Sequence, residues 1–158
     1  MQIFGGSEVA ARLGSIHDRF AEAAKGSLNG WAQELASYII AEKLSGQVLK
    51  RRSGRLSRSV HGYTDAQAES VSAGAAAGRN VPYARIHEFG GMIPAHTVVA
   101  RNARALMIPL KDGRTIFRRS ANIPEVEMPV RSYMRSGLAD RRESGLALLR
   151  EALKQALA

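Results

Sequence analysis

The sequence predicts an α+β protein in which helices at both ends of the chain pack on a small, mainly antiparallel sheet with an inserted hairpin. Apolar residues recur every three or four positions near both ends of the 158-residue chain, which is typical of amphipathic helices. The middle of the chain instead has short apolar segments separated by turn-forming residues, which indicates hairpins. The length is that of one domain and no repeat divides it, so we expect residues 1–158 to form a single domain.

The N-terminal part predicts two helices. Ser7 can cap the first, over residues 7–25, whose apolar face is formed by Val9, Leu13, Ile16 and Phe20. A second helix is expected over about residues 30–45, with a stripe of Trp31, Leu35, Tyr38 and Ile39. Because only Gly26 and Gly30 interrupt the pattern, one long helix with a weak point there is the alternative.

Residues 46–59 are basic, contain Ser and Gly, and show no periodicity, so they predict a loop that is mobile when unbound. The loop has five positive charges and, over 50–58, no acid: Lys50, Arg51, Arg52, Arg55 and Arg58. These cations are candidates to face phosphate or an acidic partner, and a solvated loop is the alternative.

The middle of the chain predicts two strand pairs around a short helix. Residues 59–64 and 69–75 are the first pair, joined across 65–67. Pro82 can open a helix that Gly90 and Gly91 end, and Ile86 and Phe89 are expected to dock it on the sheet. Residues 105–110 and 115–119 flank an Asp-Gly turn and predict a hairpin, and residues 125–128 are expected to be extended.

The last segment, from about 133 to 158, predicts a C-terminal helix that Ser132 can cap and whose base Tyr133 and Met134 can seal. Its expected apolar face consists of Leu138, Leu146, Leu149, Leu153 and Leu157.

The charge balance favours an acidic or phosphate-bearing neighbour. Lys and Arg number 23 against 14 acids, which gives a net charge of +9 and a pI near 10.6. The hairpin adds basic residues to those of the loop, and we expect the two segments to form one positive surface. The hairpin cations are Arg101, Arg104, Lys111, Arg114, Arg118 and Arg119.

No pattern of catalysis, metal binding or cofactor binding is complete, so we expect no enzyme activity, no metal and no cofactor. His87-Glu88 begins like the HExxH zinc motif, but Gly91 stands where the second His belongs. We therefore expect His87 to be a surface or hydrogen-bonded histidine, with a small hydrolase using His87 and Glu88 as a rival. The chain has no Cys, no apolar run near the roughly 20 residues that span a bilayer, and no secretory pattern at Met1, so we expect assembly in the cytoplasm without membrane contact.

Three segments together resemble the small morphogenesis proteins of long-tailed and Mu-like phages. Residues 53–60 are similar to the S/T-G-x-L-x-x-S-I segment of that family, residues 81–91 to YAxxHEFG, and residues 129–138 to PxRPFLxxAL. The matching positions are Gly54, Leu56, Tyr83, His87, Glu88, Phe89, Gly90, Pro129, Arg131 and Tyr133. Ser132 replaces a second Pro of the family pattern, and the stretch 95–126 is longer than in many members.

The resemblance implies a tail-completion or head–tail connector protein at the neck of the virion, with no active site. Such proteins act as rings, commonly six-fold, whose partners are their own copies and adjacent neck, connector or tail-tube proteins. Non-specific contact with packaged DNA is a further expectation. The basic loop and the hairpin at 104–119 are the candidate docking arms. A tail terminator or a head-completion or stopper protein is the alternative within the class, and a non-specific nucleic-acid-binding protein is the alternative outside it.

Overall fold

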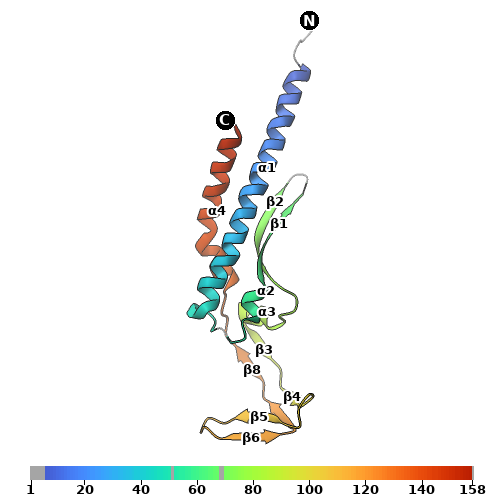
Figure 1. The fold of residues 1–158 in the computed structure, drawn as a ribbon, viewed down its shortest axis with the longest axis vertical. Helices are drawn as coiled ribbons and strands as arrows, with labels where there is room; N and C mark the ends of the chain where they lie inside the picture. Colours follow the sequence, from blue (N-terminus) through green and yellow to red (C-terminus); the bar gives the residue numbers. More distant parts are fainter. Residues whose placement is uncertain (1–5, 51, 68–69, 158) are drawn as a thin grey trace.

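The structure, a computed structural model, describes residues 6–50, 52–67 and 70–157, and it confirms the α+β class. The elements in chain order are α1 (Gly6–Tyr38), the π-helical η1 (Ile39–Gln47), α2 (Arg55–Ser59), β1 (Val60–Ala66), β2 (Val71–Ala77), α3 (Tyr83–Phe89), β3 (Gly91–Ile93), β4 (His96–Val99), β5 (Leu106–Pro109), β6 (Thr115–Arg118), β7 (Ser120–Ile123), β8 (Val126–Met128) and α4 (Met134–Leu157). α1 lies between α4 and the β1–β2 hairpin, and a long arm built from β3 to β8 extends from the end opposite the termini (Figure 1).

α1 is one continuous helix, so the alternative of a single long helix is confirmed and the division into two helices is wrong. Gly26 and Gly30 lie inside α1 without a break. A glycine in a helix interior costs only about 0.5–1 kcal/mol relative to alanine. Packing of α1 against both α4 and the β1–β2 hairpin offsets a cost of that size.

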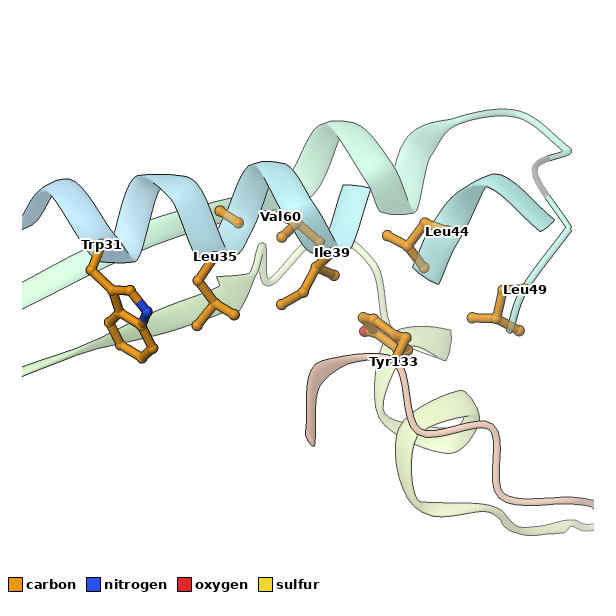
Figure 2. Packing of buried hydrophobic residues seen from close by; sticks show 8 residues of the cluster. Trp31, Leu35, Ile39, Leu44, Leu49, Val60 and Tyr133 are labelled. Carbon is orange, nitrogen blue, oxygen red and sulfur yellow. The ribbon is translucent and has the colours of Figure 1, made fainter. Parts of the chain in front are cut away.

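The hydrophobic core runs along one side of α1 and η1 (Figure 2). Trp31, Leu35 and Ile39 belong to it, which confirms most of the predicted stripe. Tyr38 is only half-buried, and its hydroxyl donates a hydrogen bond to Asp140 Oδ2 of α4 at 2.8 Å. The remaining members of the core come from α1, from η1 and from the segments that follow η1: Ala36, Leu44, Leu49, Val60 and Tyr133.

α4 and β1 approach α1 closely at glycines. A Cβ atom on Gly145 of α4 would lie 2.6 Å from the Trp31 ring, and one on Gly62 of β1 would lie 2.5 Å from the Ala32 carbonyl oxygen. The Trp31 indole N–H donates to the Arg141 carbonyl of α4 at 3.1 Å. Side chains at these two positions would push the elements apart, so the absence of a side chain sets their spacing.

The predicted leucine face of α4 is confirmed only in part. Leu146, Leu149 and Leu153 are half-buried, whereas Leu138 and Leu157 are exposed. The buried positions of α4 are Gly137 and Gly145, where the helix meets Ile39 and Trp31. α1 therefore contacts the glycine side of α4, and the leucines lie beside this contact.

The strands form four two-stranded antiparallel sheets and not the one small sheet predicted: β1–β2 is one ribbon, and the other three follow one another along a second ribbon. The first ribbon pairs β1 with β2 from Val60↔Ala77 to Ala66↔Val71, slightly longer than predicted. Its face packs on α1, while α4 packs mainly on α1 and barely on the ribbon. α1 is long enough for α4 and the β1–β2 ribbon to pack on different parts of its surface.

The second ribbon is the arm, which consists of three nested ladders, β3–β8, β4–β7 and β5–β6. The predicted hairpin around Asp112-Gly113 is confirmed as its tip, but the expected insertion 95–126 is too short because pairing begins at Gly91↔Met128. Pro94 and Pro124 lie in the gap between the first two ladders, where neither can donate a backbone hydrogen bond. Residues 101–105 bulge from one strand before β5 begins.

No residue from 89 to 132, a stretch that the structure describes completely, is buried. Large apolar side chains on the arm are exposed, among them Met92, Val99, Met107, Phe117 and Val130. The arm therefore has no hydrophobic core within its own chain. Of the helices in the described residues, none is long and apolar enough to cross a membrane.

Candidate functional site

The three segments that resemble the phage proteins meet around one cavity, below the core and beside the base of the arm. The cavity has a volume of about 810 Å³. Residues 53–57 form one wall, Tyr83 and His87 of α3 another, and Arg131 lies on the chain that leads into α4. These segments are up to 78 positions apart in the chain, and the fold brings them together.

The predicted basic loop 46–59 is a loop only in part. Arg55–Ser59 form α2, and Leu49 belongs to the hydrophobic core. Gly54 begins α2 with φ of +70°, a conformation that favours glycine, and its carbonyl accepts hydrogen bonds from Ser57 Oγ at 2.9 Å and Arg58 N at 3.0 Å. Leu56 is partly buried and packs against the core.

Glu88 of α3 organises the start of α4. Its carboxylate is 4% exposed and accepts hydrogen bonds from the backbone N–H groups of Tyr133, Met134 and Arg135 at 2.8–3.0 Å. The Ser132 hydroxyl donates to it at 2.7 Å, and Arg135 Nε at 3.2 Å. The first turn of α4 thus receives its cap from another helix, and the expected capping by Ser132 is wrong because Ser132 donates to that carboxylate instead.

Burial by itself would raise the pKa of Glu88, but the hydrogen bonds outweigh it. Those from Met134, Arg135, Ser132 and Tyr133 lower the pKa below its ordinary value of 4.5. Glu88 is therefore ionised at neutral pH, and its negative charge faces the positive end of the α4 dipole. Both oxygens of the Glu88 carboxylate accept hydrogen bonds from residues 132–135, so Glu88 has a structural role and does not face the cavity.

Phe89 does not dock α3 on a sheet, so that expectation is wrong. It is 57% exposed, and the guanidinium group of Arg135 lies over its ring at 4.9 Å. The residues of α3 that are buried are Ala84 and Glu88, which are four apart and share the face toward α4. Phe89 is one position further along, where Arg135 of α4 covers its ring but the side chain stays mostly exposed.

Gly90 joins α3 to the arm. Its φ is +68°, and a Cβ atom there would lie 2.9 Å from the Met128 carbonyl oxygen, so both the conformation and the space require glycine. Nearby, Arg131 N donates to the His87 carbonyl at 2.8 Å. Together with the adjoining Gly91↔Met128 pair, these contacts fix the base of the arm against the body. Pro129, two residues before Arg131, is exposed in the connecting strand.

His87 is neither a surface histidine nor one with a hydrogen-bonded Nδ1, contrary to expectation. It is half-buried, its ring meets the Tyr83 ring edge-on at 5.9 Å, and its buried Nδ1 atom has no hydrogen-bond partner among the described residues. Burial, and then the charge of Arg131, lower the pKa of His87. Burial also raises the pKa of Tyr133 to about 12, with a further contribution from the charge of Glu88. His87, which lines the cavity, therefore adds no charge to it at neutral pH.

Four cations line the cavity, and none of its described lining residues is acidic. Three are predicted partner-facing residues, Lys50, Arg52 and Arg55, and the fourth is Arg131. Arg55 also donates to the Asn80 carbonyl at 3.3 Å. Arg58 is exposed on α2 and donates to the Ser53 carbonyl, and Arg51 lies outside the described residues. Apolar side chains of Leu44, Val48, Leu49 and Leu56 form the remaining wall.

The basic residues of the hairpin form a second, separate surface. β3 and β8 lie between α2 and α3, whose residues line the cavity, and the β5–β6 tip of the arm (Figure 1), so the expected single positive surface is wrong. Arg118 and Arg119 are exposed there. Arg114 forms an ion pair with Asp112 at 2.7 Å within the turn, which reduces its share of the field.

The sequence analysis missed the apolar part of the cavity. Val48 and Leu49 belong to the basic stretch 46–59, which was predicted to be a loop because of its charge. Two adjacent aliphatic residues before the basic run were the available signal. In the parts of the chain that the structure describes, no three His, Cys, Asp or Glu residues are grouped so that they could hold a metal ion.

The described part of the chain thus presents a cavity lined by cations and, beyond its base, an arm that buries no residue. A comparison with protein families finds that the phage virion morphogenesis family matches residues 7–157. The chain belongs to the phage virion morphogenesis family. Searches of curated proteins and of solved structures found no match. Family membership supports a structural role in the phage virion.

Proposed function

We propose that this protein is a ring subunit that completes the phage tail at its head-proximal end and joins tail to head at the neck. The observation that carries the proposal, beyond family membership, is the arm without a buried residue. The subunit has a positioning role and performs no reaction. Its copies form the ring, and the arm contacts the adjacent component of the neck or tail.

The tip of the arm needs a packing partner on both of its faces. Met107 and Phe117 are register partners on one face and are 69% and 68% exposed. Leu106, Ile108 and Ile116 lie on the other face and are only half-buried. A two-stranded ribbon is marginally stable at best in water, so apolar residues on both faces favour a tip that is completed by a second molecule.

The charge of the tip indicates the chemistry of that partner. Between residues 100 and 119 the chain has six basic residues and one acid, Asp112, which is paired with Arg114. We infer that the tip docks on a neighbouring virion protein whose surface is apolar at its centre and acidic at its rim. Charges at the rim guide association, while the buried apolar pair supplies the affinity.

Removing the tip tests this proposal. Val99 and Ser120 are register partners, so residues 100–119 can be replaced by Asn-Gly, which closes a two-residue hairpin. We expect the variant to fold with an unchanged melting temperature and to form rings, but to reduce the yield of joined particles at least tenfold when it is the only copy. Electron micrographs would then show separate heads and tails.

A matched pair of variants separates the two parts of the contact. Met107→Ser with Phe117→Ser is expected to weaken joining more than Arg118→Gln with Arg119→Gln, because the first pair removes apolar burial and the second only rim charge. Normal particle yield from the variant without the tip would contradict the proposal.

The net charge of +9 also favours a second candidate, non-specific binding of nucleic acid. This function predicts that the isolated chain binds duplex DNA with an affinity that falls steeply with salt and does not depend on sequence. Replacing the tip arginines by Gln would lower the steepness of that salt dependence, whereas Met107→Ser with Phe117→Ser would not. The apolar pair therefore distinguishes protein docking from DNA binding.

A further inference from the structure

The cavity is suited to an anionic ligand, because four exposed cations line it and none of its described lining residues is acidic. Lys50, Arg52, Arg55 and Arg131 carry four positive charges around about 810 Å³, and among the described residues none of the four forms an ion pair. Like charges held together in a partly enclosed space repel one another, so an anion that enters gains from several of them at once.

The shape and the apolar wall favour a peptide over DNA. Duplex DNA displays its phosphates on the outside of a wide cylinder and is read by exposed side chains, whereas this site is a cavity. Single strands bind by stacking on aromatic platforms, and Tyr83, edge-on to His87, is the one Tyr, Phe or Trp among the described lining residues. Leu44, Val48 and Leu56 between the cations suit a segment that alternates carboxylates with apolar side chains.

The chain itself contains such a segment. Residues 124–128 read Pro-Glu-Val-Glu-Met, and Glu125 and Glu127 are two apart on an extended stretch, which places both carboxylates on one face. Both are exposed, and neither forms an ion pair with the described residues. Val126 between them is also exposed.

We propose that the cavity of one subunit binds the Glu125–Glu127 segment of a second copy of this chain. The contact is heterologous, because two different surfaces meet. Repetition of such a contact generates a closed ring when the rotation between subunits closes, and an open filament when it does not. The inference therefore rests on the ring in the proposed function and names the surfaces that join its subunits.

A peptide experiment tests the cavity directly. The receptor is the full chain with Glu125→Lys and Glu127→Lys, which keeps the cavity but cannot supply the segment. The probe is a fluorescein-labelled peptide of residues 122–129. We expect binding by fluorescence anisotropy, at least tenfold weaker binding of the same peptide with both Glu replaced by Gln, and loss of binding when the receptor also has Arg52→Glu and Arg55→Glu.

A charge exchange tests the contact in the assembled protein. Arg52→Glu with Arg55→Glu, and separately Glu125→Lys with Glu127→Lys, should each shift the oligomer toward monomer in native mass spectrometry. All four changes in one chain should restore it. Arg118→Glu with Arg119→Glu makes the same change in net charge at the arm tip and should leave the oligomer intact.

Four outcomes would overturn the inference. The acidic peptide does not bind, or the combined variant stays monomeric. Cavity reversals abolish binding of duplex DNA while the peptide does not compete with the DNA, which would assign the cavity to nucleic acid. Rings form regardless of either reversal, which would refute this contact and leave the proposed function standing. Joining that survives removal of the arm tip would refute the proposed function, and the peptide would still decide the cavity.

Discussion

Glu88 supplies from a distant helix the cap that the sequence before α4 does not provide. Three backbone N–H groups at the start of α4 donate to its carboxylate, which is almost fully buried. A buried charge is tolerated when hydrogen bonds satisfy it. Removing either the carboxylate or its donors leaves the other group buried without a partner, which lowers the stability of the fold. The residue therefore couples the position of α3, and with it the base of the arm, to the long C-terminal helix.

Replacing Glu88 by Ala is expected to reduce the free energy of unfolding by about 3 kcal/mol, because the N–H groups of the first turn lose their acceptor. Urea unfolding followed by circular dichroism measures this. Arg135→Gln is the control: its side chain is 59% exposed in the ion pair, so its removal should cost less than about 1 kcal/mol. Equal effects of the two substitutions would contradict the capping role.

The same carboxylate predicts the effect of acid. Its pKa in the folded chain is lowered from 4.5, so its contribution to stability is present above pH 4.5 and is lost as the pH falls through the lower folded pKa. The stability difference between the wild type and Glu88→Gln, measured by urea unfolding at several pH values, should be constant near neutrality and shrink below pH 4.5. A difference that grew on acidification would refute the assignment.

Two glycines in helices should respond to alanine in opposite directions. Gly30→Ala is expected to stabilise by about 0.5–1 kcal/mol, since a Cβ atom there meets nothing within 4 Å. Gly145→Ala should destabilise by about 1–3 kcal/mol despite the same gain in helix propensity, because its Cβ atom would lie 2.6 Å from the Trp31 ring. Differential scanning calorimetry of the two variants checks this, and two shifts of the same sign would be evidence against close packing of α4.

At the residue scale, sequence patterns identified positions but not their partners. The motif resemblance marked Glu88, Gly90 and Tyr133, and all three occupy well-defined structural places. The cap formed by Glu88 involves residues 44 to 47 positions away, and no local pattern encodes a contact of that range. In the sequence, Gly145 looks like any glycine that lowers helix propensity. Only the structure shows that Trp31 leaves no room for a side chain there.

Among the elements, those with a strong local signal were predicted best. The Asp-Gly turn, the short helix between Pro82 and Gly90, and the C-terminal helix were located within a few residues. The ladders β3–β8 and β4–β7 were missed, since each pairs strands of three or four residues that are about 20 to 40 positions apart. Such short strands leave little periodicity to detect.

The arm is expected to be the least protected element in hydrogen exchange. Its prolines interrupt the ladder between β3 and β4, and it buries no residue, so local opening should be frequent. Exchange in the free chain should be at least tenfold faster for the amides of β4 to β7 than for residues 31–39 of the core, and it should slow markedly in assembled particles. Mass spectrometry of both states provides the comparison.

Equal protection of the arm before and after assembly would mean that it is already complete in the free subunit. That result would remove the main structural support for a docking role, even though family membership would be unaffected. The β1–β2 ribbon serves as the internal control, because it already packs on α1 in the free subunit.

At the scale of the whole molecule, the sequence predicted the class and the family but not the distribution of charge. A net charge of +9 says that an acidic neighbour is favoured, yet the structure divides the cations between a cavity and a distant tip. Which cations share a surface depends on the path of the arm, which in turn depends on contacts remote in sequence. Under the proposed function, the cavity serves the ring and the tip serves the adjacent component.

Trp31, the one tryptophan of the sequence, is an intrinsic fluorescence probe of the fold. Trp31 is 7% exposed, is held by an N–H bond to Arg141, and lies against Gly145, so its fluorescence senses whether the two long helices remain together. Trp31 belongs to α1, and the β5–β6 tip of the arm lies well away from α1 (Figure 1). The emission wavelength of Trp31 should shift to the red when the body unfolds and stay constant when the tip engages, which separates loss of structure from loss of docking in one unlabelled sample.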